Sequence, residues 1–555
     1  MKNKYIRCFI SAAFVLVMLL AMNMTVFAET TADSESMTGS INAGLYDSST
    51  STATVSAATN APDFTSMKVV ASSGKTLVFK NVYFTGAKCL MMSAAVSSGS
   101  TNKSIELYID SVDASNKIGV LNTGSHAKVN DYDFTEQYAD LAEVTGTHDL
   151  IFSFKDTTEL ELDWFKMTSY TGTETKEQKD ARMEWWREAK YGQFIHMGAY
   201  SYLGGYYKGT KYTGYSEWIM EKMKISKKDY KANAAANFNP VDFDAEKIVS
   251  DAKAAGEKYI IITSRHHEGF SIYDTQIRNF KDYSLFSVGN GGNYTRPDPL
   301  KALSRECKKQ GLHFGAYITI MDWYDPSQEN YKDIVSDSAK AEYKAQLKGQ
   351  VKELIEDYGV EVFFFDGDWV SWWTNDDGKE MYRYILSLNE KCIVNDRVGH
   401  NRSKTIGDYS TPEQKIPDTG SDYDWESCVT MNGSWGYKDY QSRKYKTYHA
   451  LRLFGGLVKN YPTICSVTGG VKGDPLAFAV KSADGKKSAL LVVDYKGKGC
   501  TLTVNVKGVD GRKVVAKVLD STRDVEECAV DLQDGVLKLE KADENSAAFL
   551  VTFDL

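Results

Sequence analysis

Hydrophobic and polar positions follow two patterns along the chain, and the changes between them divide it into domains. From residue 66 to residue 170, short runs such as Ser104–Ile109 alternate apolar with polar positions, and clusters of Gly, Ser, Asn and Asp separate the runs. Evenly spaced short strands with turn signals are typical of a β-sandwich. The same pattern returns in residues 470–555, so a second β-sandwich is predicted there.

Residues 179–465 show the other pattern, in which continuous apolar runs alternate with helical stretches. Runs such as Val362–Phe365 contain no polar position, as expected of strands that are buried on both faces of a parallel sheet. The repeated order of strand, helix and strand favours a barrel over a doubly wound sheet. The predicted fold class is therefore multidomain, with a central (β/α)8-type barrel flanked by an N-terminal and a C-terminal β-sandwich.

The first 65 residues fit neither pattern. Basic residues precede the apolar run Phe9–Met22, and Val26–Ala28 ends in a small residue of the kind found at a signal peptidase site. Residues 1–28 are predicted to be a signal peptide and the mature protein to be secreted, because the run is short for a membrane span. Residues 29–65 are rich in Ser, Thr, Ala and Gly and are predicted to be a disordered linker.

Charge and cysteine content exclude several classes of protein. The formal net charge of −8 argues against nucleic acid as a partner, because surfaces that bind phosphate are normally basic. Seven cysteines remain after the signal peptide, without a Cys-x-x-Cys pair. This scatter fits neither a disulfide scaffold nor a zinc site, so we expect mostly buried thiols.

Polar residues follow the predicted strands of the barrel at the point where each strand ends. Asp366 ends the run Val362–Phe365 and precedes Gly367, while His196, His266 and His267 follow two earlier strands. A barrel brings such strand ends together at one rim, where active sites of this fold lie. Asp366 could instead cap a helix or open a turn.

A metal ion is not expected at this rim, and no cofactor is predicted. His266 and His267 are adjacent on a predicted strand, so their side chains should point to opposite faces and could not easily share one ion. Hydrogen bonding to ligand hydroxyl groups is the better use of these imidazoles.

Nine strings in the central region, including Tyr191-Gly-Gln-Phe-Ile-His-Met-Gly and Arg265-His-His-Glu-Gly-Phe, resemble the α-L-fucosidases of glycoside hydrolase family 29. In order, they are Tyr191–Ser201, Tyr215–Trp218, Phe238–Ala245, Arg265–Phe270, Phe314–Tyr317, Phe365–Gly367, Asn395–Gly399, Gly407–Gln414, and Trp425–Cys428 followed by Ser434–Tyr437. Met197, Arg265 and Glu268 stand where the family usually has Trp, Lys and Asp. After Tyr437 the chain departs from the family pattern, so the last barrel strands cannot be placed.

The resemblance implies retaining hydrolysis of terminal α-L-fucosyl groups from a fucosylated glycan. Asp366 matches the family's nucleophile. Glu413 is the first choice for the acid/base and Glu426 the second. Such a reaction needs two carboxyl groups about 5 to 5.5 Å apart. By the same resemblance, substrate-binding roles are expected for His196, Glu217, Trp218, His266, His267, Arg397 and Trp435.

The N-terminal sandwich resembles family 6 carbohydrate-binding modules in Ile105–Asp110, Thr123–Ser125, Gly146–Phe154 and Leu162–Phe165. His126 stands where such modules commonly carry a Trp, so a structural spacer and a sugar-binding module both remain open.

Two other functions remain open at this point. One is a related glycosidase that acts on another sugar, and the other is a non-catalytic glycan-binding protein on a degenerate barrel. The oligomeric state cannot be inferred from the chain.

Overall fold

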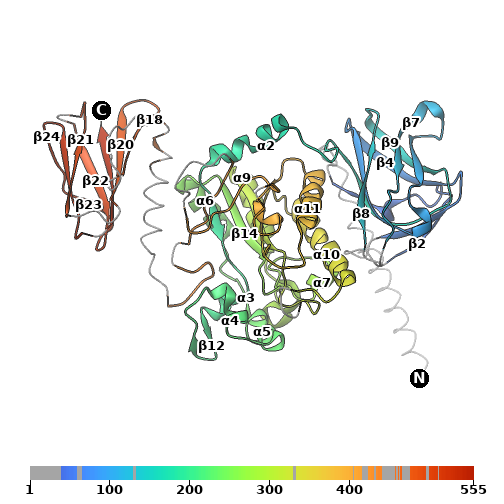
Figure 1. Ribbon diagram of the computed structural model, residues 1–555, viewed down its shortest axis with the longest axis horizontal. Helices are drawn as coiled ribbons and strands as arrows, with labels where there is room; N and C mark the ends of the chain where they lie inside the picture. The colour runs from blue at the N-terminus through green and yellow to red at the C-terminus, as the bar shows by residue number, and fades with distance from the viewer. Residues whose placement is uncertain are drawn as a thin grey trace, which may run out of the picture.

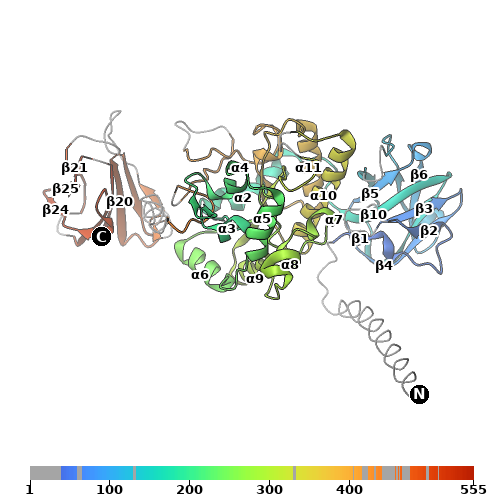
Figure 2. The ribbon, with the colours of Figure 1, turned by 90° about the horizontal axis from the view of Figure 1, so that it is seen from below.

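The computed structural model places three β-rich or mixed regions in a row (Figures 1 and 2). It describes residues 39–58, 66–128, 133–328, 333–403, 405–415, 423–430, 433–440, 457, 460–461, 463–465, 476–494, 499–509, 512–544 and 546–554. The predicted signal peptide, residues 1–28, lies outside the described residues.

The N-terminal region is built of two antiparallel sheets that enclose one core. Phe79, Phe152 and Phe165 meet in that core, with ring centroids 4.6 to 5.6 Å apart. The strands of one sheet run in the order β2-β3-β10-β5-β8, with β1 beside β10, and those of the other in the order β4-β9-β6-β7. Their bounds are β1 Ile41–Asn42, β2 Thr54–Ala57, β3 Met67–Ala71, β4 Thr76–Thr85, β5 Cys89–Val96, β6 Ser104–Ile109, β7 Lys117–Asn122, β8 Thr135–Asp140, β9 Thr145–Phe154 and β10 Thr158–Thr168.

The start of this sandwich differs from the prediction. Residues 29–65 were predicted to be a linker, but β1 pairs with β10 and β2 pairs with β3 along residues 54–57. Composition misjudged this segment because a few of its residues, among them Ile41 and Ala43, are buried in the core of the sandwich. Its backbone pairs with strands whose side chains already form the core.

One face of the sandwich packs directly on the central region. Met91 and Trp164 belong to the same buried cluster as the central helices, and the ring of Trp164 lies 6.1 Å from that of Tyr384. Lys348 is buried between Glu136 of the sandwich and Glu380, at 2.8 and 2.6 Å. The module is therefore fixed to the central region by a shared apolar core and by buried ion pairs.

The central region contains a parallel sheet with helices on its outer side. The described part of the sheet has five strands in the order β11-β14-β15-β16-β17, whereas the predicted barrel has eight. The bounds are β11 Gln193–Ile195, β14 Tyr259–Arg265, β15 His313–Thr319, β16 Val362–Asp366 and β17 Ile393–Val394. A small hairpin, β12 Tyr206–Tyr207 and β13 Thr210–Lys211, follows β11.

Helix boundaries in this region follow from capping residues. In α9, Asp298 accepts hydrogen bonds from Leu300 N and Lys301 N, Pro299 opens the helix, and Gly311 ends it with a φ of 78°. The helices are α2 Lys176–Ala189, α3 Ala199–Leu203, α4 Ile219–Lys222, α5 Lys227–Asn233, α6 Ala245–Ala255, α7 Arg278–Lys281, α8 Leu285–Val288, α9 Pro299–Gln310, α10 Asp337–Glu356 and α11 Asn375–Leu388. Among the described residues, no helix is both long enough and apolar enough to cross a membrane.

Strand alternation divides the sheet into two faces. Ile260, Ile262, Phe363 and Phe365 belong to the large cluster formed with the covering helices. The alternate positions, among them Ile261, Tyr317, Val362 and Phe364, form a second cluster with Cys428 and Trp435 on the inner side. Residues that follow β17 in the chain therefore cover the inner face of the sheet.

The C-terminal region consists of two antiparallel sheets with a shared core. The sheet orders are β18-β19-β20-β26-β22-β23 and β21-β25-β24, and Val492, Leu537 and Phe549 are fully buried in one cluster. The bounds are β18 Thr463–Cys465, β19 Leu476–Lys481, β20 Lys487–Asp494, β21 Thr501–Asn505, β22 Val514–Leu519, β23 Asp524–Cys528, β24 Asp531–Gln533, β25 Val536–Glu540 and β26 Ala547–Asp554. Because β18 pairs with β19, this region begins inside residues 179–465, which were assigned to the barrel.

The seven cysteines of the predicted mature chain are free. Cys89, Cys307, Cys392 and Cys428 are buried, two more are partly buried, and Cys500 is exposed. The expectation of mostly buried thiols is met.

Candidate active site

Asp366 is the last residue of β16 and the top of a column of side chains on the inner face. Val362, Phe364 and Asp366 alternate along the strand, and Phe364 belongs to the inner cluster. The carboxylate accepts hydrogen bonds from Arg397 Nη1 at 2.5 Å and from the Tyr317 hydroxyl at 2.9 Å. Asp366 therefore lies at the carboxyl end of a central parallel strand, in contact with a guanidinium.

The environment of Asp366 keeps its carboxylate ionised. Burial alone would raise the pKa of Asp366, but the charge of Arg397 and the neighbouring His267 hold that pKa well below its usual range. His267 Nε2 lies 3.4 Å from Asp366 Oδ2. An ionised carboxylate with a fixed orientation is what a nucleophile requires.

Three imidazoles surround this carboxylate, and burial keeps them neutral. Burial lowers the pKa of His196 to about 3 and lowers those of His266 and His267 as well. The His266 ring stacks on Tyr317 at 4.9 Å, and the His196 ring stacks on Trp435 at 5.1 Å. Neutral imidazoles with one N–H each can donate to hydroxyl groups of a ligand and accept from them.

The expectation that His266 and His267 point to opposite faces is wrong. Their ring centroids lie 4.3 Å apart, because β14 ends at Arg265 and a turn follows, in which Gly269 N donates to His266 O. His266, His267 and Asp366 offer ligand atoms within 4.8 Å of one another, close enough to hold a metal ion. The guanidinium of Arg397 on Asp366 disfavours a second cation at this point.

Glu413 lies on the other side of the same guanidinium. Arg397 Nη2 donates to Glu413 Oε2 at 3.2 Å, and Trp435 Nε1 donates to Glu413 Oε1 at 3.1 Å. Arg402 Nη2 also reaches Glu413 Oε2 at 3.2 Å. One arginine side chain thus holds Asp366 and Glu413 at opposite ends of its guanidinium.

These residues line a cavity of about 440 Å3, a size that suits a sugar ring with part of its neighbour. Eight of the ten predicted site residues line it, namely His196, Glu217, Trp218, His266, Asp366, Arg397, Glu413 and Trp435. His267 lies behind this surface, against Asp366 and the ring of Trp218. Glu217 accepts a hydrogen bond from Gly436 N, and burial raises the pKa of Glu217 to about 7.

Several lining residues were not predicted. Phe194, Tyr212, Tyr215, Tyr317 and Phe364 add aromatic walls, and Lys222 adds a cation. Trp369, which was expected from its place after Asp366 and Gly367 to wall a pocket, also lines the cavity. Strand alternation could have found Tyr317, because it pairs with Phe364 two positions before Thr319 pairs with Asp366. The tyrosines of the loop after β13 carry no such signal, because no regular period relates them to the sheet.

Glu426 lies away from this cavity. Its Oε2 accepts a hydrogen bond from the Tyr259 hydroxyl at 2.6 Å, and Tyr259 is the first residue of β14. The amino ends of parallel strands lie at the opposite edge of the sheet from Asp366. The structure therefore brings Glu413, and not Glu426, to the cavity that Asp366 lines.

Arg265, the last residue of β14, and Asp322, which follows β15, also lie away from the cavity. Arg265 is fully buried and donates to Gln350 on α10 and to Asp322. This pair stabilises the contact between the sheet and its covering helices and does not line the cavity.

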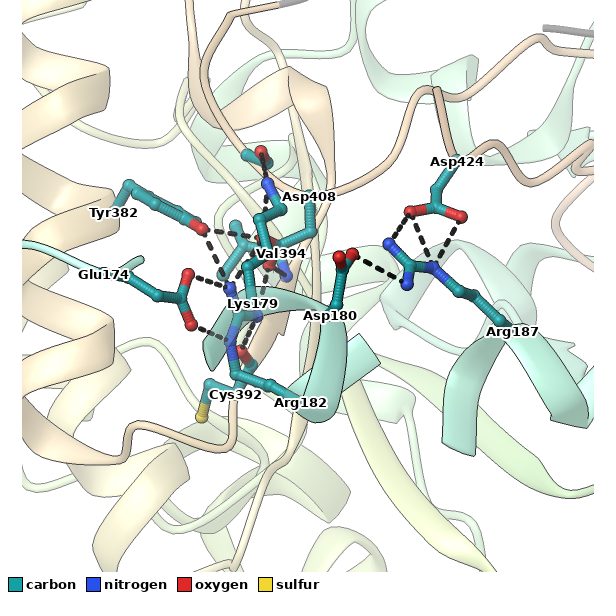
Figure 3. A network of polar contacts seen from close by, with 11 residues as sticks. Glu174, Lys179, Asp180, Arg182, Arg187, Tyr382, Cys392, Val394, Asp408 and Asp424 are labelled. Carbon is teal, nitrogen blue, oxygen red and sulfur yellow. Dashed lines mark hydrogen bonds and ion pairs between the residues drawn. The ribbon is translucent and has the colours of Figure 1, made fainter. Parts of the chain in front are cut away.

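A buried network holds the segment that carries Glu413 (Figure 3). Arg182 of α2 binds both carboxylate oxygens of Asp408, at 2.8 and 2.9 Å, and also binds Glu174. Asp408 in turn accepts a hydrogen bond from Val394 N of β17. The chain at Asp408, five residues before Glu413, is thereby fixed to the sheet by side chains of a helix more than 200 residues earlier in the sequence.

A second contact of α2 holds the segment before Cys428. Arg187 pairs with Asp424 at 2.8 Å and with Asp180 at 3.0 Å, as Figure 3 shows. Glu413 and Cys428 then form a parallel bridge between the two held segments. The position of Glu413 thus depends on contacts of side chains from α2.

Comparisons with known proteins give two family matches. A family model described as alpha-L-fucosidase matches residues 161–458, and a model of carbohydrate binding module family 6 matches residues 42–169. The N-terminal sandwich is therefore similar to family 6 carbohydrate-binding modules.

Individual relatives match the central region. An alpha-L-fucosidase of Dictyostelium discoideum is 28% identical over 278 residues, covering 46% of this chain and 58% of the relative. A tissue alpha-L-fucosidase of Bos taurus is 26% identical over 273 residues, covering 46% and 55%. The chain thus spans about half the length of the curated relatives it matches. The crystal structure of a GH29 alpha-L-fucosidase from Bacteroides thetaiotaomicron is similar with a TM-score of 0.49 and 21% identity, covering 69% of this chain and 98% of that one.

The matched region contains the strand that ends in Asp366 and the segment that carries Glu413, and the family model spans more than half of the chain. The chain belongs to the alpha-L-fucosidase family.

Proposed function

We propose that this protein is a secreted exo-acting glycosidase that hydrolyses terminal α-L-fucosyl groups with retention of anomeric configuration. The observation that carries the proposal is the position of Arg397 between two carboxylates, Asp366 at 2.5 Å and Glu413 at 3.2 Å. A retaining glycosidase needs a nucleophile and an acid/base that face each other across one sugar ring.

In the first step, a carboxylate oxygen of Asp366 attacks the anomeric carbon of the fucosyl group. The bond from that carbon to the leaving-group oxygen breaks, and Glu413 gives its proton to this oxygen. The charge of Arg397 and the Tyr317 hydroxyl hold Asp366 in one orientation for the attack. The product of this step is a fucosyl ester of Asp366.

In the second step, a water molecule attacks the anomeric carbon from the side that the leaving group vacated. Glu413 takes a proton from this water, and the ester bond to Asp366 breaks. Two displacements restore the original configuration. The neutral His196 and His266 hold the hydroxyl groups of the sugar throughout, because they line the cavity and lack a charge that would need solvent.

Two features of the architecture belong to this proposal. We infer that the parallel sheet is part of a (β/α)8-type barrel, which is supported by parallel bridges that continue beyond β17, at Asn395 with Tyr409 and at Ser410 with Trp425. We also infer that the C-terminal sheets form a β-sandwich, which is supported by their shared core. Secretion rests on the composition of residues 1–28.

The test is hydrolysis of 4-nitrophenyl α-L-fucoside by the full chain, followed by nuclear magnetic resonance of the first fucose released. We expect hydrolysis that requires Asp366, with α-fucose as the first product. The comparison substrates are the 4-nitrophenyl glycosides of L-galactose and of arabinose. L-Galactose keeps the ring hydroxyl groups of fucose and differs at the methyl group.

Each result assigns the chain differently. Hydrolysis of the galactoside but not the fucoside would identify a glycosidase for another sugar. Binding of fucose without hydrolysis of any aryl glycoside would identify a glycan-binding protein. Release of β-fucose first would overturn the retaining mechanism.

A further inference from the structure

A lysine-rich segment runs along the cavity of this otherwise acidic protein. Residues 206–231 contain seven lysines and three acidic residues, while the whole chain has a formal net charge of −8. The segment covers the hairpin β12–β13, α4 and most of α5. Its charge is therefore opposite to that of the chain as a whole.

The same segment supplies one wall of the cavity. Tyr212, Gly214, Tyr215, Glu217, Trp218 and Lys222 all line it. Tyr215 is 40% exposed although it lines the cavity, so its ring lies at the opening. Glu413 lines the same cavity, and burial and the charge of Glu413 raise the pKa of Tyr215.

Two further cations lie beside this wall, on the ring of Tyr440. Lys211 Nζ is 3.8 Å from the ring centroid and Lys438 Nζ is 5.6 Å from it. The Tyr440 hydroxyl donates to the carbonyl of Tyr212, which is a lining residue. The two ammonium groups thus gather beside the cavity wall.

These ammonium groups lack acidic partners within the part of the chain that the structure describes. Lys438 is 1% exposed and donates to the Thr213 carbonyl at 3.3 Å. Among the described residues, no carboxylate lies at ion-pair distance from Lys438 or from Lys211. Burial lowers the pKa of Lys438, Glu217 partly offsets this effect, and Lys211 lowers it further. Unpaired cations held close together repel each other, and an anion bound between them would relieve that repulsion.

We propose that the leaving-group side of the cavity takes a glycan that carries an anionic group, a carboxylate or a sulfate ester, on the sugar next to fucose. This inference rests on the proposed function and names the class of substrate. Tyr215 offers an aromatic face on which that second sugar can stack. Lys211 is an exposed cation before it in the chain, and Lys222, which pairs with Glu221 at 2.9 Å, is an exposed cation after it. The negative charge of the chain elsewhere would direct an acidic glycan to this wall.

The experiment compares three fucosyl disaccharides of one linkage, in which the second sugar is galactose, galacturonic acid or galactose sulfate. We expect kcat/KM at about 20 mM salt to be about 10-fold higher for at least one anionic disaccharide than for the neutral one. This preference should fall to about 3-fold or less at about 300 mM salt, because salt screens exposed charges. The two anionic substrates distinguish a carboxylate from a sulfate ester.

Variants of Lys211 test whether this side chain causes the preference for the anionic disaccharide. Lys211→Glu should lower the ratio of anionic to neutral kcat/KM by about 10-fold, because it replaces an attractive charge with a repulsive one. Lys211→Met, which keeps the apolar stem over Tyr440, should lower it by about 3-fold. Lys309→Glu is the matched control, since Lys309 is an exposed residue at the end of α9 and changes the net charge equally.

The outcomes separate this inference from the proposed function. Equal kcat/KM for all three disaccharides, or equal effects of Lys211→Glu and Lys309→Glu, would overturn the anionic substrate class and leave the fucosidase proposal intact. Failure of the unaltered protein to hydrolyse any fucoside, the aryl fucoside included, would overturn both.

Discussion

The two carboxylates that share Arg397 are held in different ways. Asp366 ends a strand that is hydrogen-bonded on both sides, with Thr319 of β15 opposite it, and it is 8% exposed. Glu413 lies after the last described strand of the sheet, on a segment whose fixed points are the buried Asp408 and the hydroxyl of Thr411. The backbone ladder places one carboxylate, and distant side chains place the other.

Because of this difference, we expect the two carboxylates to respond differently to substitutions. A strand in the middle of a sheet cannot shift without breaking hydrogen bonds on both sides, so substitutions near Asp366 should change chemistry more than position. A segment held by ion pairs moves when one of those pairs is removed, so substitutions far from Glu413 should change its position.

Asp366→Ala should have the largest effect, a fall in kcat of about 10⁴-fold, because it removes the nucleophile. The measurement is hydrolysis of 4-nitrophenyl α-L-fucoside. Added azide should restore part of the activity and give β-fucosyl azide, because a small anion can fill the space of the missing carboxylate and attack from the same side. Activity within about 10-fold of the unaltered protein would remove Asp366 from the mechanism.

Glu413→Gln should lower kcat/KM by about 10²- to 10³-fold for a natural leaving group, and less for an aryl leaving group that needs little protonation. Glu426→Gln is the matched control on the neighbouring segment, and we expect a change of no more than about 3-fold, because Glu426 binds Tyr259 outside the cavity. The reverse order of the two effects would assign the acid/base to Glu426.

Arg182→Met tests whether α2 positions Glu413. Asp408 has no exposed side-chain surface, so loss of its partner should cost about 3 to 5 kcal/mol of stability and lower kcat by about 10-fold with KM nearly unchanged. Arg187→Met removes a pair that is about one-third exposed and should cost less than about 1 kcal/mol. The basic limb of the pH profile for kcat should shift in Arg182→Met only. A uniform loss of active protein, with an unchanged profile, would mean that the network is structural alone.

The sequence allowed the strand-held half of the site to be predicted better than the other half. Four apolar residues before an acid and a glycine indicated the strand and the position of Asp366, and alternation along that strand accounts for Phe364 beneath it. Five parallel strands are described. The remaining strands of the predicted barrel could not be placed from the sequence, because the segments that contain Tyr409 and Trp425 pair through single bridges, with Asn395 and Ser410, and not through strands with a hydrophobic period. The predicted relation of His266 to His267 was wrong because the strand ends at Arg265 and does not continue through the two histidines.

The choice between Glu413 and Glu426 lay beyond local pattern. Both are single glutamates in segments without regular structure, and the resemblance to a family ordered them without a physical reason. Their separation in space follows from Arg182 and Arg187, which contact Asp408 and Asp424 across 226 and 237 positions of sequence. Pairing of side chains at such distances leaves no period in the sequence that could be recognised.

The smallest expected effect is the pH dependence of stability that Glu426 causes. Burial raises the pKa of Glu426 from about 4.5 to about 7, although the Tyr259 hydroxyl and Arg397 act against this. A carboxyl whose folded pKa is raised contributes stability below its unfolded pKa and loses it as pH rises through the folded pKa. The unaltered protein should therefore lose up to about 3 kcal/mol between pH 4.5 and 7 from this group. Glu426→Gln should lack that loss, because an amide does not ionise and its oxygen can still accept from Tyr259. Denaturant midpoints of the two proteins should be similar near pH 4.5 and separate towards pH 7, where the unaltered protein should be the less stable. Parallel curves would show that Glu426 is ionised throughout and solvated.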